Sequence, residues 1–240
     1  MVVGNLKLYL LAPLLICAAL DWRFADGNRQ RVAMDVPCCL TIHYATTSPT
    51  SLSEARAVRR YDLDSSRSKF IARAFSGGLL WFKGHDHLIA VREFTGEAQL
   101  TPESITPASL QLTAKAGSMV ETRDVFTEPQ KQIINRELRE IVLLPDQYPD
   151  IVFKSTNISG TAIGNNQYDL KIVGDLTLHG VTRRITIPTK VVLTENELRA
   201  QGEFSINRSD FKVKATSAVH GLIRVRDRVK FEFDIVGHQR

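Results

Sequence analysis

The chain has 240 residues, of which 43% are hydrophobic and 24% charged, so it holds enough apolar side chains for a packed core and is not a wholly disordered chain. Its formal net charge is +5 at pH 7, and the cations are spread along the sequence, so they indicate an anionic partner only weakly. All three cysteines, Cys17, Cys38 and Cys39, precede residue 40, which excludes an internal disulfide or a thiolate metal cluster from the rest of the chain.

Residues 1–20 carry a signal-like hydrophobic segment. The stretch from Leu8 to Leu20 contains no charge, and small residues at Cys17-Ala18-Ala19 resemble a cleavage region. The run is short for a transmembrane helix and typical of a secretory signal, with a buried core helix as the alternative. The sequence therefore predicts an exported protein, either periplasmic or secreted. Residues 21–59 are polar and rich in Ser, Thr and Arg, which indicates a linker or poorly ordered segment.

Residues 60–238 alternate apolar and polar side chains with a period close to two. Near the C-terminus Ile223, Val229 and Phe233 share one face, and Arg224 and Lys230 share the other. This alternation is typical of strands with one buried and one solvated face. Further strands are expected at about 68–75, 79–91, 93–100, 108–116 and 150–158.

One segment departs from the strand pattern. Thr127 followed three residues later by Gln130 forms a capping-box pattern, and Pro129 suits the first helical turn. Apolar residues then recur at helical spacing through Val142. The predicted fold is therefore all-β: an eight-stranded extended antiparallel barrel interrupted by one α-helix, because a sheet this long normally curls and closes.

Three segments resemble the YceI-like family of exported bacterial proteins: "LLPDQYPDIVFKST", "YDLKIVGDLTLHGVTRRITIPTKV" and "FSINRSDFKV". The resemblance covers roughly residues 60–237. The residues that carry its signature are Gly174, Asp175, Leu176, Thr177, His179, Gly180, Thr182, Asn207 and Arg208.

The resemblance implies a lipocalin-like barrel whose elongated apolar lumen holds a polyisoprenoid, such as an isoprenoid quinone, or another long-chain amphiphilic lipid. It implies an exported binding protein with no catalytic residues and no cofactor, in a sequestration, transport or stress role. The chain departs from the family pattern in "FSGGLLWFKGHDHLIAV" and at Lys212, which bears on ligand identity more than on the fold.

The lumen is expected to be lined by large apolar side chains on the inward face of the strands. Apolar walls are needed because burying a lipid chain gains about 0.8 kcal/mol per CH₂ group. The alternative for each residue is a dry, packed core. The predicted lumen residues are Phe70, Trp81, Leu112, Phe153, Leu170, Ile172, Phe204 and Phe231.

His85 and His87 would share one face of an extended strand, which is one way to build half of a metal site. His179 and His220 are the candidates for the missing ligands, although each precedes a glycine and is equally explained by a turn. One alternative is that "GHDH" is a turn at the mouth of the barrel, where the imidazoles hydrogen-bond neighbours or line the entrance. Another is that His85 and His87 bind a ligand headgroup at this mouth. No metal is predicted from this pair alone.

The basic row Arg224, Arg226, Arg228 and Lys230 indicates either contact with anionic headgroups at a membrane surface or a solvated outer face. Nucleic-acid binding is not expected, because Phe231 alternates onto the inward face. No paired carboxylates or Ser/His/Asp set are evident, so no catalysis is predicted. The leading hypothesis is a lipid-binding protein; the alternatives are a metal protein or metal-dependent enzyme using His85 and His87, and a structural barrel with a filled core. The sequence does not indicate the oligomeric state.

Overall fold

The computed structural model describes residues 57–102, 104–218, 220 and 222–240. The signal-like segment 1–20 and nearly all of the linker 21–59 lie outside the described residues. The strands are β1 (Arg59–Gly77), β2 (His87–Val91), β3 (Phe94–Thr101), β4 (Ile105–Lys115), β5 (Met119–Glu121), β6 (Asp150–Gly164), β7 (Gln167–Leu178), β8 (Val181–Leu193), β9 (Glu197–Asn207), β10 (Ser217–Ala218) and β11 (Ile223–Gln239).

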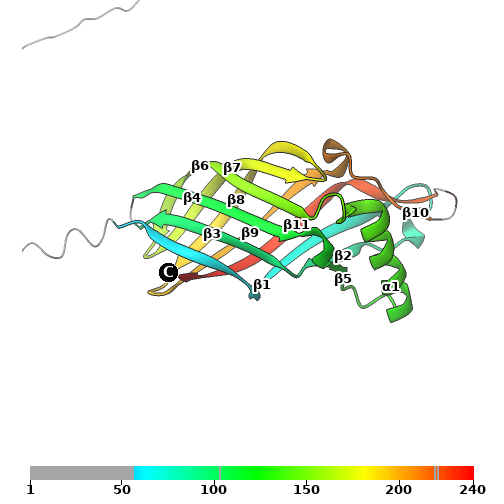
Figure 1. Cartoon of the computed structure of the whole chain (residues 1–240), viewed down its shortest axis with the longest axis horizontal. Coiled ribbons are helices and arrows are strands. Elements are labelled where there is room, and N and C mark those ends of the chain that lie inside the picture. The colour runs from blue at the N-terminus through cyan, green and yellow to red at the C-terminus, as the bar shows by residue number, and fades with distance from the viewer. Residues whose placement is uncertain (1–56, 103, 219, 221) are drawn as a thin grey trace, which may run out of the picture. The chain divides into compact units, whose positions relative to one another are not determined.

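Eight long strands close into an antiparallel barrel (Figure 1). The pairing order is β1–β3–β4–β6–β7–β8–β9–β11, and β11 then pairs with β1. That closing ladder runs from Tyr61 opposite Gln239 to Gly77 opposite Arg224, so it spans the full length of both strands. The short strands β2, β5 and β10 extend the ladders at one end. The predicted all-β barrel is confirmed.

The expected strand at 79–91 is wrong in its first half, where the structure has a turn and a short 3-10 helix, Trp81–Lys83, before β2. Gly78 adopts a left-handed φ of +88°, and a Cβ there would lie 2.5 Å from the carbonyl oxygen of Leu222. The chain therefore turns tightly against the start of β11 instead of continuing as a strand.

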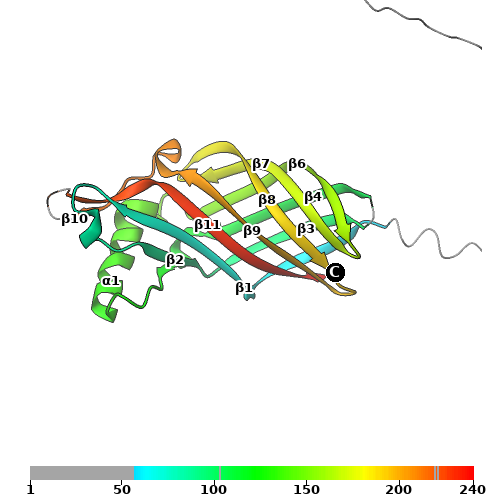
Figure 2. The same ribbon diagram turned by 180° about the vertical axis from the view of Figure 1, so that it is seen from behind.

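The predicted helix is present as α1 (Glu128–Glu137) and continues as a π-helical turn, Leu138–Leu143. The side chain of Gln130 accepts hydrogen bonds from the backbone N–H of Thr127 at 2.8 Å and from its hydroxyl at 3.1 Å. Figure 2 shows α1 at the end of the barrel that also carries β10. Within the described part of the chain, no helix combines the length and the apolar character needed to cross a bilayer.

The side chain of Phe211 anchors the 3-10 helix Arg208–Phe211 to the barrel and is only 1% exposed. We predict that Phe211→Ala lowers the free energy of unfolding by about 3–5 kcal/mol, because it leaves a cavity in a packed site. Denaturant unfolding measures this change. The neighbouring exposed residue provides the control: Asp210→Ala should change the stability by about 0.5 kcal/mol or less. Equal effects of the two substitutions would contradict this packing.

Candidate functional site

The barrel encloses an apolar cavity of about 540 Å³. Seven of the eight predicted lumen residues line it, and every one of the eight long strands contributes to its wall. The interior is therefore hollow, which contradicts the alternative of a structural barrel with a filled core. The seven residues are Phe70, Leu112, Phe153, Leu170, Ile172, Phe204 and Phe231.

Phenylalanines from β1, β9 and β11 form one wall of the cavity. The rings of Phe204 and Phe231 are stacked, with centroids 4.9 Å apart and planes 8° apart. Phe70 approaches Phe231 at 6.1 Å. These residues face inward because they hold alternate positions on paired strands, with Phe231 directly opposite both Phe204 and Ala72. The wall is thus fixed by the ladder that closes the barrel.

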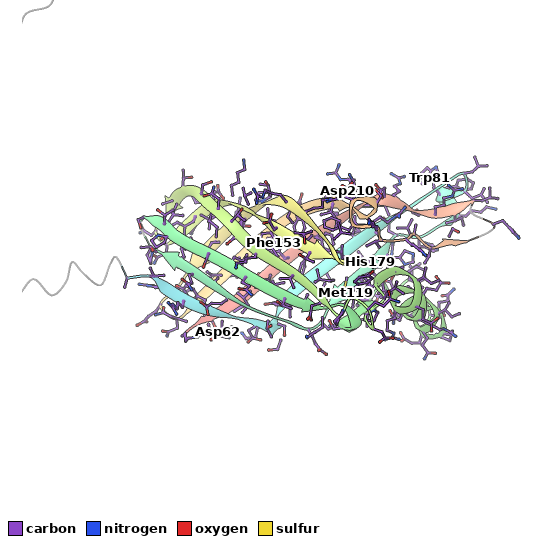
Figure 3. All side chains as sticks on the ribbon, turned by 45° about the horizontal axis from the view of Figure 1, so that its top comes forward. Asp62, Trp81, Met119, Phe153, His179 and Asp210 are labelled. Carbon is purple, nitrogen blue, oxygen red and sulfur yellow. The ribbon has the colours of Figure 1, made fainter. Side chains whose placement is uncertain are left out.

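Trp81 was predicted to lie in the lumen, and that prediction is wrong. Its side chain is 55% exposed and does not line the cavity. The prediction assumed a strand from residue 79, whereas Trp81 begins the 3-10 helix, where inward and outward positions do not alternate. Figure 3 shows Trp81 at one end of the barrel, away from Phe153 in its wall.

The cavity opens beside a cluster of aromatic and polar side chains at the α1 end. The Phe126 ring is stacked on His87, at a centroid distance of 5.3 Å, and meets His85 edge-on at 5.8 Å. Helix α1 contributes further lining residues, and cations come from the segments on either side of β10. The polar and helical residues of this mouth are His85, His87, Gln130, Ile133, Ile134, Glu137, Leu138, Arg208, Lys214 and Arg224.

A buried carboxylate holds His87 in place. Glu121 is 4% exposed, and its Oε2 accepts a hydrogen bond from Nδ1 of His87 at 2.8 Å. Its Oε1 accepts backbone N–H groups of Leu88, Thr122 and Arg123 at 3.1, 3.0 and 2.8 Å. Burial raises the pKa of the carboxyl, but the bonds to His87 and the backbone outweigh this effect and leave the pKa below its ordinary value.

The hydrogen bond to Glu121 determines what His87 can bind. With Nδ1–H given to the carboxylate, the other ring nitrogen of a neutral imidazole is an acceptor. His87 lines the cavity, so it is placed to accept a hydrogen bond from a ligand hydroxyl there. The expected position of His85 and His87 at the mouth thus agrees with the geometry, while the binding of a headgroup stays a prediction.

Among the described residues, no group of three or more His, Cys, Asp or Glu side chains is placed to hold a metal ion. His179 and His220 instead occupy turns, with φ of 51° and 53°. The His179 ring packs against Tyr148 at 4.2 Å. Burial, followed by the charge of Lys214, lowers the pKa of His179 below its ordinary value, which favours the neutral ring.

The signature residues around β7 and β8 have structural roles. A Cβ at Gly174 would lie 2.4 Å from the Phe153 ring, so only glycine lets this lumen phenylalanine lie flat on the neighbouring strand. His179 and Gly180, both at positive φ, form the two-residue turn between β7 and β8. Leu176 lines the cavity beside them.

The remaining signature residues join neighbouring segments. The Arg184 guanidinium donates two hydrogen bonds to Asp175, at 3.0 and 3.3 Å, and the hydroxyls of Thr177 and Thr182 lie 2.8 Å apart across the same ladder. Asn207 donates to Asp210 at 3.3 Å, and Arg208 donates to the carbonyl of Val213 at 2.9 Å. The signature therefore maintains the barrel and its end, and Leu176 and Arg208 also border the cavity.

The sequence did not indicate that Phe126 and the helix line the mouth, or that Glu121 holds His87 there. For the helix a signal existed, because Ile133, Ile134 and Leu138 form an apolar stripe on an otherwise polar segment. Glu121 is the only acid in the short segment "MVET", and nothing in that segment indicates that its side chain is buried.

Glu121 should make stability depend on pH. Because its folded pKa is lowered, it stabilises the fold above the unfolded pKa of about 4.3, and this contribution is lost as the pH falls through the folded value. We predict that Glu121→Gln lowers the free energy of unfolding by about 2 kcal/mol at pH 7. In urea titrations the difference from the unsubstituted chain should shrink below about pH 4. A difference that stays constant from pH 7 to pH 3 would contradict an ionised Glu121.

Comparisons with known proteins agree with this geometry. A model of the YceI-like domain matches residues 61–237. The crystal structure of Burkholderia cenocepacia BcnA superimposes with a TM-score of 0.56 at 21% identity, covering 72% of this chain and 98% of that chain. The structure of a polyisoprenoid binding domain from Saccharophagus degradans implicated in plant cell wall breakdown gives 0.51 at 17% identity, covering 75% and 98%.

At these identities the two structures show a shared fold, and no curated protein sequence matches the chain. The family model carries the assignment, since it covers residues 61–237 and so includes part or all of each of the eight barrel strands. The resemblance seen in the sequence is thereby confirmed: the chain belongs to the family of proteins with a YceI-like domain.

Proposed function

We propose that the chain is an exported, non-catalytic binding protein that holds a polyisoprenoid or another long-chain amphiphilic lipid in its barrel. The observation that carries this proposal is the cavity of about 540 Å³ with walls of aliphatic and phenylalanine side chains. A structural similarity to a domain described as polyisoprenoid-binding supports the same ligand class. The signal-like segment at residues 1–20 supports export.

The chemistry of the cavity favours a ligand with a long apolar chain. Each buried CH₂ group gains about 0.8 kcal/mol, and a largely preformed cavity keeps the cost of ordering the protein low. Most of the residues that line the cavity are Ala, Leu, Ile, Val and Phe, whose side chains carry no acid or base. Retention of a lipid, without chemical change, is the activity that these walls support.

The polar mouth favours an amphiphile over a plain hydrocarbon. The apolar chain lies within the barrel, and the headgroup lies among His85, His87 and the polar residues of α1. His87, oriented by Glu121, accepts a hydrogen bond from a hydroxyl headgroup, such as that of a polyprenol.

Filling the cavity tests the location of the ligand. Ile187 is 8% exposed and lines the cavity, whereas the adjacent Thr186 faces solvent on the same strand. We predict that Ile187→Trp weakens polyprenol uptake about tenfold or more, because the indole occupies space that the lipid chain needs. Thr186→Trp adds the same ring outside the barrel and should leave uptake unchanged. Titration with a fluorescent polyprenol analogue measures both, and equal affinities for the two variants would contradict binding inside the barrel.

The contribution of His87 to ligand binding can be separated from that of the apolar cavity walls. His87→Phe keeps a ring to stack on Phe126 but removes the hydrogen-bond acceptor. We predict about 5- to 30-fold weaker binding of a polyprenol, equivalent to 1–2 kcal/mol, and unchanged binding of squalene, an isoprenoid hydrocarbon without a headgroup. Competition assays with the two ligands on each protein make the comparison. An equal loss for both ligands would assign His87 to packing and not to headgroup recognition.

A further inference from the structure

The turn between β1 and β2 exposes an unusual amount of apolar surface. Leu79 is 76% exposed, Phe82 63% and Trp81 55%, and these are the three most exposed large hydrophobic side chains in the described residues. Leu222, 39% exposed, immediately precedes β11 and lies against the turn at Gly78. We call these four residues the apolar tip. Exposed clusters of this kind mark interaction sites more often than isolated surface leucines do.

The backbone holds the apolar tip in a defined form. The N–H of Leu80 donates to the carbonyl of Leu222 at 3.0 Å, which ties the turn to β11. The N–H groups of Lys83 and Gly84 close the 3-10 turn on Leu80 and Trp81 at 2.9 and 3.1 Å. The Trp81 and Phe82 rings meet edge-on at 6.4 Å. The backbone is thus satisfied locally, while the apolar side chains are left facing solvent.

The charges around the apolar tip are positive. Lys83, Arg224 and Arg226 are exposed, and the sequence has no acidic residue in 76–84 or in 220–226. The acids that follow these two stretches in the sequence are Asp86 and Asp227. Asp86 accepts the N–H of Ser76 at 3.1 Å and lies 4.0 Å from Arg73, and Asp227 accepts two hydrogen bonds from Ser209. The tip therefore combines aromatic and aliphatic side chains with a cationic rim.

The apolar tip lies next to the mouth of the cavity. Ser76, at the base of the turn, and Ile223 and Arg224, beside Leu222, line the cavity. Figure 3 shows Trp81 at the opposite end of the barrel from Asp62, and Figure 1 shows α1 and β10 at this same end. A ligand that leaves through this mouth would pass the tip.

We propose that the apolar tip docks the barrel mouth onto the surface of an anionic lipid bilayer. Tryptophan favours the membrane–water interface, leucine and phenylalanine gain free energy on entering the acyl region, and each surface cation adds about 1 kcal/mol on an anionic leaflet. This contact would let a lipid pass between the bilayer and the lumen, a role that rests on the proposed function. The docking itself needs no bound ligand.

Vesicle binding tests the proposal. The chain has two tryptophans, Trp22 and Trp81, so a Trp22→Phe background makes Trp81 the reporter. With vesicles of phosphatidylglycerol and phosphatidylcholine, Trp81 emission should shift to the blue and be quenched by brominated acyl chains. Leu79→Ser/Phe82→Ser should weaken co-sedimentation with these vesicles about tenfold or more. Binding should also fall as salt or the phosphatidylcholine fraction rises.

The matched control variant replaces two other exposed apolar residues of the barrel. Ile163→Ser/Val192→Ser removes side chains that are 52% and 42% exposed, at the β6–β7 and β8–β9 ends, and should leave vesicle binding unchanged. Uptake of a polyprenol from detergent solution should be the same in the tip variant as in the unsubstituted chain. Equal uptake would show that the tip variant is folded, and it would separate membrane docking from lipid binding in the barrel. The docking proposal would be overturned if the protein does not bind vesicles, if Trp81 is not quenched, or if the tip and control variants lose binding equally. The apolar tip would then be assigned to a protein partner.

Discussion

The pairing of β11 with β1 is the constraint on which the rest of the structure depends. Twelve pairs of residues join these strands, from Tyr61–Gln239 to Gly77–Arg224, and they convert an open sheet into a closed barrel. Closure fixes which side chains face inward, and the inward set is rich in Ala, Leu and Ile, which do not fill the interior. The hollow is therefore a consequence of strand number and side-chain size together. Phe231 and Ala72 pair within this ladder and also line the cavity, so the strands that close the barrel also form part of the cavity wall.

The two ends of the barrel differ in chemistry. Near the C-terminus, Arg240 forms ion pairs with Asp62 and with Glu97, and His238 lies 3.1 Å from Asp64, so charged side chains join β1, β3 and β11 there. The other end has α1, the histidine cluster and the apolar tip. The first end is thus tied by ion pairs between strands, whereas the second also presents exposed apolar and cationic side chains.

The sequence predicted the barrel well because alternation with a period of two is clear in β7, β8 and β9, although bulges interrupt it in β1 and β6. It also predicted seven lumen residues, since each of them, from Phe70 to Phe231, lies on a regular ladder. It failed at Trp81 because a left-handed Gly78 and a 3-10 turn abolish the alternation, and "LLWF" reads as a buried strand when the turn is not recognised. It could not predict that Glu121 is buried beneath His87, because that contact joins β5 to β2 and has no local signal. The regular elements were thus accessible from the sequence, and the mouth, built from irregular segments, was not.

We propose that the barrel retains a long-chain lipid in its lumen. The most direct measurement is native mass spectrometry of the protein purified without denaturation from bacteria, followed by solvent extraction and identification of the released molecule. The account predicts one amphiphile with a long apolar chain bound per barrel, lost on extraction and recovered when a polyprenol is added back. A protein that carries no amphiphile, and that does not take up a polyprenol after complete delipidation, would contradict it.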